Sequence, residues 1–179
     1  MRRTTTFRIT FCAVFAALCC AATMAVRIPT PAGYTNLGEG VVLLSGFLLG
    51  PQYGALAAAA GSALADLLAG YGYYVPGTFL IKGGTALLAA WMLRAAGASG
   101  GRTLPRTMLC ALPAELWMVA GYFGYKALIL RKGLAAAASI PNNLVQALTG
   151  IVLASLLYRA LLRVPEAERF FRKGGFYHV

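Results

Sequence analysis

The sequence predicts an all-α integral membrane protein that forms a single domain over residues 1–179, and three observations lead to this prediction. Hydrophobic residues make up 59% of the chain and charged residues only 12%, whereas a soluble domain carries about 25% charged residues. Apolar runs of membrane-spanning length recur along the chain. The 16 Lys and Arg residues, which give a net charge of +11, fall mostly between and beyond those runs. This composition excludes a soluble fold, a disordered chain and a nucleic-acid binder.

Six apolar segments are long enough, or nearly long enough, to cross a bilayer core of ~30 Å as helices. Pro- and Gly-rich breaks separate them, because these residues end helices. The clearest breaks are Pro29–Asn36, Gly50-Pro51 and residues 70–74 (GYGYY). The predicted spans are 7–28, 37–50, 52–69, 76–94, 105–130 and 141–162, followed by a charged cytoplasmic tail over 163–179. Five or seven spans stay open as alternatives, because a run as short as 37–50 can be re-entrant.

The distribution of basic residues predicts the orientation in the membrane. When the N-terminus is placed in the cytoplasm, most Lys and Arg residues lie on the inner side, so both termini are predicted to be cytoplasmic. Arg2 and Arg3 before an apolar run also resemble the start of a signal peptide. Because the rest of the chain is itself apolar, the first span can serve as an uncleaved anchor.

Ionisable side chains inside apolar spans are costly and therefore are candidates for function. Those present are Glu39, Asp66, Lys82 and Glu115. In the predicted topology they lie in the outer half of the bundle, together with the amides of Asn142, Asn143 and Gln146. A mid-membrane carboxylate needs a partner, and Lys82 is the only base inside a span at the level of Glu115. Structural alternatives are helix capping by Glu39, a turn contact by Asp66 and snorkelling by Lys82.

Aromatic residues gather at the same level as these polar groups, among them Trp117 and Tyr122. Aromatic walls with a few convergent polar groups are typical of a small-molecule site. An interfacial aromatic belt is the alternative for the tyrosines, and Trp117 faces either the lipid or the pocket. A channel would carry polar groups at several depths, so the sequence favours a pocket that opens to one side.

Small residues recur every four positions on the first span, at Ala13, Ala17, Ala21 and Ala25. Positions i and i+4 share a helix face, and small faces let membrane helices approach closely. The third span carries a similar run at Ala57, Gly61, Ala65 and Ala69. One such face can serve internal packing, which leaves the other for a second subunit.

The chain carries no recognisable catalytic motif: it has no phosphate-binding loop, no H-E-x-x-H and no G-x-S-x-G. The four cysteines form no C-x-x-C pair and the single histidine is His178, so we expect neither a metal nor a disulfide framework. We predict that the protein is not an enzyme and carries no cofactor. A transporter of this kind takes its energy from a partner or from an ion gradient.

Several segments together resemble the substrate-binding S components of energy-coupling factor (ECF) vitamin transporters. The resemblance covers roughly residues 7–163 and is most evident in the branch that includes riboflavin, hydroxymethylpyrimidine and queuosine-precursor S components. Besides the six spans and the alanine face, it rests on 34–40 (YTNLGEG), 49–51 (LGP), 61–66 (GSALAD), 82–83 (KG), 117–122 (WMVAGY) and 141–146 (PNNLVQ).

The resemblance implies a six-helix bundle in a prokaryotic cell membrane that binds a micronutrient at its extracellular side, under a lid over residues 29–36. The alanine face of the first helix would dock on a transmembrane T protein that carries two ATPase subunits. The implied ligand-binding residues are Asn36, Glu39, Lys82, Glu115, Trp117, Tyr122, Asn143 and Gln146. A base at Lys126 departs from the acid expected there and bears on ligand choice.

Three acids at membrane level against one lysine favour a cationic or amine-bearing nitrogen heterocycle over an anion. Hydroxymethylpyrimidine or another thiamine precursor, pyridoxine-like vitamers and queuosine precursors all fit. Two other functions stay open at this point. One is a stand-alone secondary transporter of a small metabolite, or a channel; the other is an intramembrane enzyme or assembly factor, with Glu115 and Lys82 as an acid–base pair. The outward placement of the polar groups disfavours the first of these, and the absence of a nucleophile disfavours the second.

Overall fold

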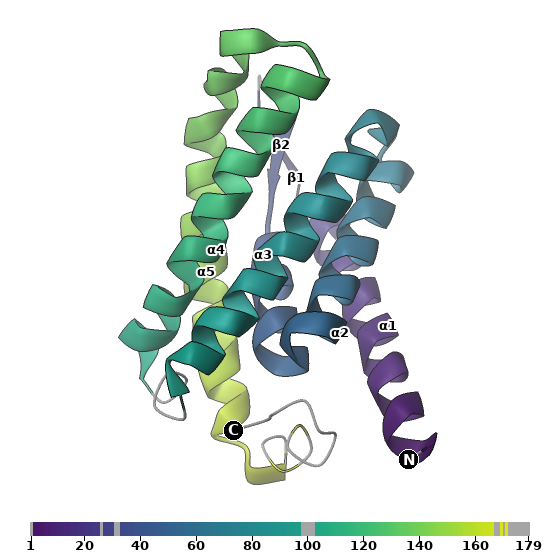
Figure 1. The fold of residues 1–179 in the computed structure, drawn as a ribbon, viewed down its shortest axis with the longest axis vertical. Helices are drawn as coiled ribbons and strands as arrows, with labels where there is room; N and C mark the ends of the chain where they lie inside the picture. Colours follow the sequence, from purple (N-terminus) through teal and green to yellow (C-terminus); the bar gives the residue numbers. More distant parts are fainter. Residues whose placement is uncertain are drawn as a thin grey trace.

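The computed structural model describes residues 2–25, 27–30, 33–97, 103–166, 169 and 171. The described chain is almost entirely helical, with one short antiparallel hairpin (Figure 1). The α-helices are α1 (Arg2–Ala25), α2 (Gly38–Leu68), α3 (Val75–Ala95), α4 (Leu104–Gly124) and α5 (Ile140–Leu162). The hairpin pairs β1 (Arg27–Thr30) with β2 (Gly33–Asn36), and the short helices are η1 (Gly72–Tyr74), η3 (Tyr125–Ile129) and η4 (Gly133–Ser139).

Helix α2 joins the second and third predicted spans, so five α-helices cover the six predicted segments in the described chain. The two halves meet at Gly50, whose backbone (φ 74°, ψ −176°) is not helical, and Pro51 follows it. The Ser45 hydroxyl donates to the Gly54 carbonyl at 3.0 Å. Residues nine apart in a straight helix would be about 13.5 Å apart, so α2 folds back on itself.

Three helical stretches are long and apolar enough to cross a membrane on length and composition, namely Thr5–Ala25, Gly38–Leu68 and Gly133–Leu162. The fold is therefore a helical membrane bundle, while the count of six crossings stays a prediction. Helix α1 begins and α5 ends at the same end of the bundle (Figure 1).

The linker predicted over 29–36 is extended where the structure describes it, because it belongs to the β1–β2 hairpin. Residues 31 and 32 lie outside the described residues, as do 98–102 and most of the predicted tail.

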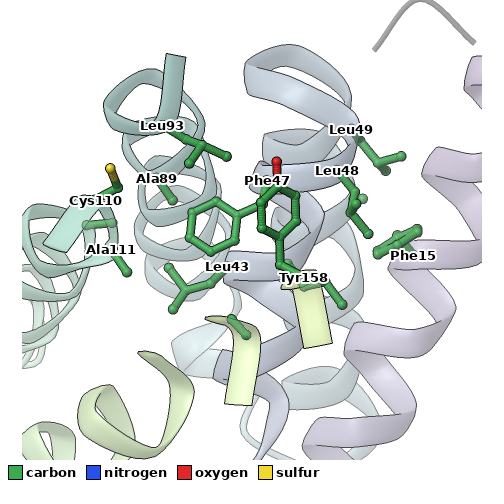
Figure 2. Packing of buried hydrophobic residues seen from close by; sticks show 14 of the residues in the cluster. Phe15, Leu43, Phe47, Leu48, Leu49, Ala89, Leu93, Cys110, Ala111 and Tyr158 are labelled. Atoms are coloured by element: carbon green, nitrogen blue, oxygen red, sulfur yellow. The ribbon is translucent and has the colours of Figure 1, made fainter. Parts of the chain in front are cut away.

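The apolar core lies at the helix ends that point away from the hairpin. Phe47 near the break in α2, Leu93 at the end of α3, Cys110 at the start of α4 and Tyr158 at the end of α5 pack together there (Figure 2). The rings of Phe47 and Tyr158 have centroids 5.3 Å apart.

Small residues set the distance between α1 and α2. A side chain built on Gly61 would meet the Cβ atom of Cys19 at 2.8 Å as well as the backbone of Ala16. Ala57 and Ala65 on the same helix are fully buried, so the small face of α2 packs inside the bundle. The small face of α1 does not, because its members are all exposed: Ala13, Ala17, Ala21 and Ala25.

Candidate functional site

One pocket opens between the helices at the hairpin end of the bundle. It encloses about 640 Å³ of space free of protein atoms, including its opening to solvent. Every α-helix contributes a side chain to its wall, and so do the hairpin and the turn after α2. The lining residues are Thr23, Asn36, Gly38, Ser62, Asp66, Tyr71, Tyr74, Thr78, Lys82, Tyr122, Lys126, Asn142, Asn143 and Gln146.

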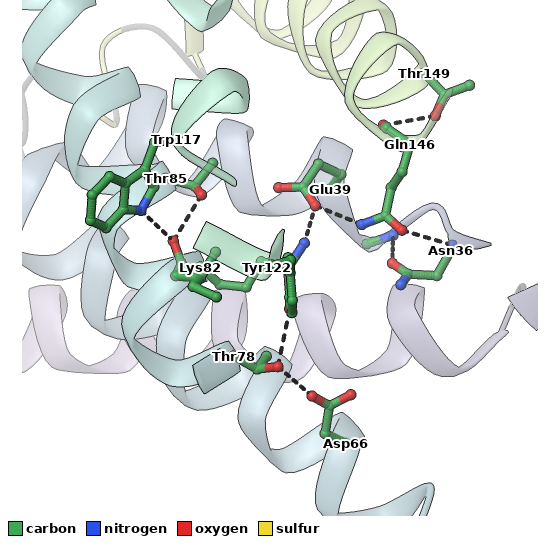
Figure 3. Close-up of polar contacts among 12 residues, drawn as sticks. Asn36, Glu39, Asp66, Thr78, Lys82, Thr85, Trp117, Tyr122, Gln146 and Thr149 are labelled. Carbon is green, nitrogen blue, oxygen red and sulfur yellow. Dashed lines mark hydrogen bonds and ion pairs between the residues drawn. The ribbon is translucent and has the colours of Figure 1, made fainter. Parts of the chain in front are cut away.

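A buried ion pair between Glu39 and Lys82 lies at the floor of this pocket (Figure 3). Glu39 lies in the first turn of α2, where an acid suits the helix dipole. Its Oε2 atom accepts from Lys82 Nζ of α3 and, at 2.8 Å, from the Gln146 amide of α5. Gln146 Oε1 in turn accepts from the backbone N–H of Asn36 at 3.4 Å. One carboxylate thus ties three helices to the end of the hairpin.

Two close approaches bring these elements together. The Asn36 side chain accepts from the backbone N–H of Gly38 at 2.8 Å, which fixes the turn from β2 into α2. A Cβ atom on Gly150 of α5 would lie 2.8 Å from the Cβ and Cγ atoms of Glu39. The absence of a side chain at Gly150 therefore lets the Glu39 stem lie against α5.

A second chain of hydrogen bonds crosses the pocket wall nearer its opening. The Thr78 hydroxyl donates to Asp66 at 2.5 Å and lies 3.0 Å from the Tyr122 hydroxyl. Lys82 Nζ lies 5.4 Å from the centre of the Tyr122 ring, within cation–π range. The Asp66 side chain therefore takes part in the site, in addition to the turn contact that the sequence suggested for this residue.

Tyrosines surround the opening itself. Lys126 Nζ lies 5.6 Å from the ring centre of Tyr74, and the Tyr125 hydroxyl donates to the backbone of Tyr73 at 2.7 Å. Burial raises the pKa of Tyr74 to about 12, and the neighbouring Tyr73 and Asp66 add to this effect. The Tyr74 hydroxyl therefore stays protonated at physiological pH and can donate a hydrogen bond.

The structure brings together five of the eight predicted ligand-binding residues as pocket lining: Asn36, Lys82, Tyr122, Asn143 and Gln146. Glu39 lies just beneath them as the partner of Lys82. Glu115 is buried but does not line the pocket, and both of its carboxylate oxygens lack a hydrogen-bond partner. Lys82 pairs with Glu39, although its predicted depth in the membrane suggested Glu115 as the partner. Depth alone does not determine which residues a helix turns toward its neighbours.

Trp117 lies outside the pocket. Its side chain is 46% exposed, and its indole N–H donates to the Ile81 carbonyl at 3.1 Å on the neighbouring helix. Of its two predicted positions, the structure places it on the outer surface.

Sequence reasoning missed several lining residues, because small hydroxylated side chains are common in membrane helices and give no signal by themselves. Thr23, Ser62 and Thr78 are of this kind. Tyr74 lies in the predicted break over residues 70–74, which by itself did not indicate a site. Among the described residues, no three His, Cys, Asp or Glu side chains gather as a metal site would require.

Comparisons with known proteins agree with this architecture. A family model described as "ECF-type riboflavin transporter, S component" matches residues 3–163. A protein of Pyrococcus woesei, described as an uncharacterized protein in the gap 3' region, is 37% identical over 133 residues, which are 73% of this chain and 85% of that protein.

A crystal structure of the S component for biotin from an ECF-type ABC transporter has the same fold. The TM-score is 0.63 at 18% identity, and the match covers 96% of this chain and 99% of that one. The chain is thus a membrane-embedded, substrate-binding subunit, and it belongs to the S component family of ECF-type riboflavin transporters.

Proposed function

We propose that this subunit binds a water-soluble vitamin or vitamin precursor built on a flat nitrogen heterocycle, in the pocket between the hairpin and the helix ends. The single observation that carries the proposal is the pocket lining, which combines the aromatic rings of Tyr74 and Tyr122 with the amides of Asn143 and Gln146. Rings stack on aromatic faces, and amides match the donors and acceptors of ring nitrogens. Riboflavin, hydroxymethylpyrimidine and pyridoxine are the first ligands to test, followed by queuosine precursors.

Native mass spectrometry of the purified protein identifies what it carries, and calorimetry with the compound found measures its affinity. Lys82→Ala and Asn143→Ala, which replace two lining residues, are expected to weaken binding without preventing membrane insertion. Loss of a hydrogen bond to a charged group costs about 1.5–3 kcal/mol, which is about ten- to a hundred-fold in affinity. Unchanged affinity in both variants would mean that these lining residues have a structural role only.

We further propose that the chain is oriented with both termini in the cytoplasm, which places the pocket on the extracellular side. The common end at which α1 begins and α5 ends supports this orientation (Figure 1). The exposed alanine face of α1, centred on Ala17, is the proposed docking surface for a transmembrane T protein with two ATPase subunits. Co-purification of the chain with ATPase subunits tests this assembly, and uptake in cells that lack those subunits would instead support a stand-alone secondary transporter.

A further inference from the structure

Glu115 is a buried acid whose hydrogen-bonding capacity is entirely unmet. It lies on α4 with 2% of its surface exposed, and neither carboxylate oxygen has a hydrogen-bond partner. Glu39 Oε1 is also buried without a partner, since Lys82 and Gln146 both bond to Oε2. Half of the six buried unpartnered side-chain atoms in the described chain therefore belong to these two carboxylates.

Groups from every α-helix surround the Glu39–Lys82 pair. Cys19 of α1 and Tyr122 of α4 interact electrostatically with both Glu39 of α2 and Lys82 of α3. Helix α5 contributes the neutral amide of Gln146. Glu115 of α4 interacts electrostatically with both members of this pair. Two carboxyl groups thus share a single buried base.

An ionised and unpartnered carboxylate is very costly in a low-dielectric interior, and in practice such a group is neutralised. The pocket wall does not include Glu115, so a ligand in the pocket does not reach it. A proton requires no cavity, and it removes the charge that makes the burial of this side chain costly. We propose that Glu39, Lys82 and Glu115 form a buried proton-binding site in which Glu115 carries one proton while Glu39 stays ionised against Lys82.

The proton makes the floor of the pocket electrically neutral. From the sequence, the excess of acids over bases favours a cationic ligand. With Glu115 protonated and Glu39 paired with Lys82, these three residues carry no net charge. The floor of the pocket then favours a ligand by its hydrogen-bonding groups and not by its charge. This inference does not depend on which vitamin binds, so its failure would leave the proposed binding function standing.

Infrared spectroscopy of the full-length, ligand-free protein at neutral pH tests the proposal. Selective ¹³C labelling of the glutamate carboxyl groups identifies the C=O stretching band of a protonated glutamic acid by its isotope shift. The wild type is expected to show one such band, and Glu115→Gln, which keeps the shape of the side chain, is expected to lose it. The exposed Glu166 is the matched control, and Glu166→Gln is expected to leave the band unchanged.

Two further variants test the charge count. Lys82→Met leaves two acids without a base and is expected to double the band, whereas Glu39→Gln is expected to abolish it because Glu115 then ionises against Lys82. Each variant is compared only if it elutes as a single species in detergent. The wild-type spectrum alone can overturn the proposal, because absence of a protonated glutamate band would mean that Glu115 is ionised. A band that persists in Glu115→Gln would overturn it as well.

Discussion

Gly150→Ala is expected to disturb the pocket floor from behind, through the close approach of α5 to Glu39. The added methyl would lie 2.8 Å from both the Cβ and Cγ atoms of Glu39 and 3.4 Å from its carbonyl carbon. Because Glu39 is held by Lys82 and Gln146, its stem has little room to shift. Overpacking of a filled interior costs about 1–3 kcal/mol.

Gly124→Ala is the matched control, because this glycine is also helical but has no atom within 4 Å of its Cβ position. Both substitutions gain about 0.8–1 kcal/mol of helix propensity, so the difference between the two variants isolates the overpacking cost. We expect Gly150→Ala to be less stable than Gly124→Ala by about 1–3 kcal/mol in chemical unfolding from detergent micelles.

Ligand affinity provides a second measurement on the same pair of variants. Displacement of Glu39 loosens its bonds to Lys82 and Gln146, and each bond to a charged group contributes about 1.5–3 kcal/mol. Gly150→Ala is therefore expected to bind at least about tenfold more weakly, while Gly124→Ala binds as the wild type does. Equal stability and equal affinity of the two variants would refute the view that Glu39 is fixed between α3 and α5.

Three further predictions concern docking, orientation and the outer surface. Ala17→Trp is expected to preserve ligand binding but to abolish both co-purification with the T protein and uptake. The control, Ala57→Leu on the buried face, is expected to impair folding. Normal uptake with Ala17→Trp would contradict the docking proposal. Gly72→Cys is expected to react with an impermeant thiol reagent in intact cells, and Arg106→Cys is expected not to react. The reverse labelling pattern would contradict the proposed orientation. Trp117→Phe is expected to cost about 1 kcal/mol of stability, because the indole hydrogen bond is lost. Ligand affinity measured by calorimetry is expected to stay unchanged, and a tenfold loss of affinity would mean that Trp117 contributes to the binding site.

The helices could be predicted from the sequence because apolar runs and their Pro and Gly breaks report length directly. The fourth predicted span, 76–94, matches α3 at Val75–Ala95 to within one residue at each end. The fifth, 105–130, covers α4 and the π-helical turn η3, since hydropathy carries no information about hydrogen-bond register. The strand pairing of the hairpin was not predicted, because residues 29–36 indicated only that no helix could form there.

The candidate site could be predicted as a group of residues but not as a set of contacts. Charged residues in apolar spans are rare enough that their positions alone placed Glu39, Lys82 and Glu115 in the outer half of the bundle. Which acid pairs with Lys82 depends on the rotation of each helix about its axis. Small residues such as Gly150 set that rotation through close packing, and a single sequence does not reveal which glycine contacts which neighbour.

The distribution of polar and apolar groups bears on how a ligand could leave the site. The pocket is lined from the start of α3 and α5 and from the end of α4, for example by Thr78 and Asn143. The opposite ends of the same helices are filled by the apolar cluster around Phe47 and Tyr158 (Figure 2). A close-packed apolar layer offers a polar solute no hydrogen bonds along its path. Release to the far side therefore requires a change in the position or packing of the subunit. This requirement argues against passive conduction through a fixed pore.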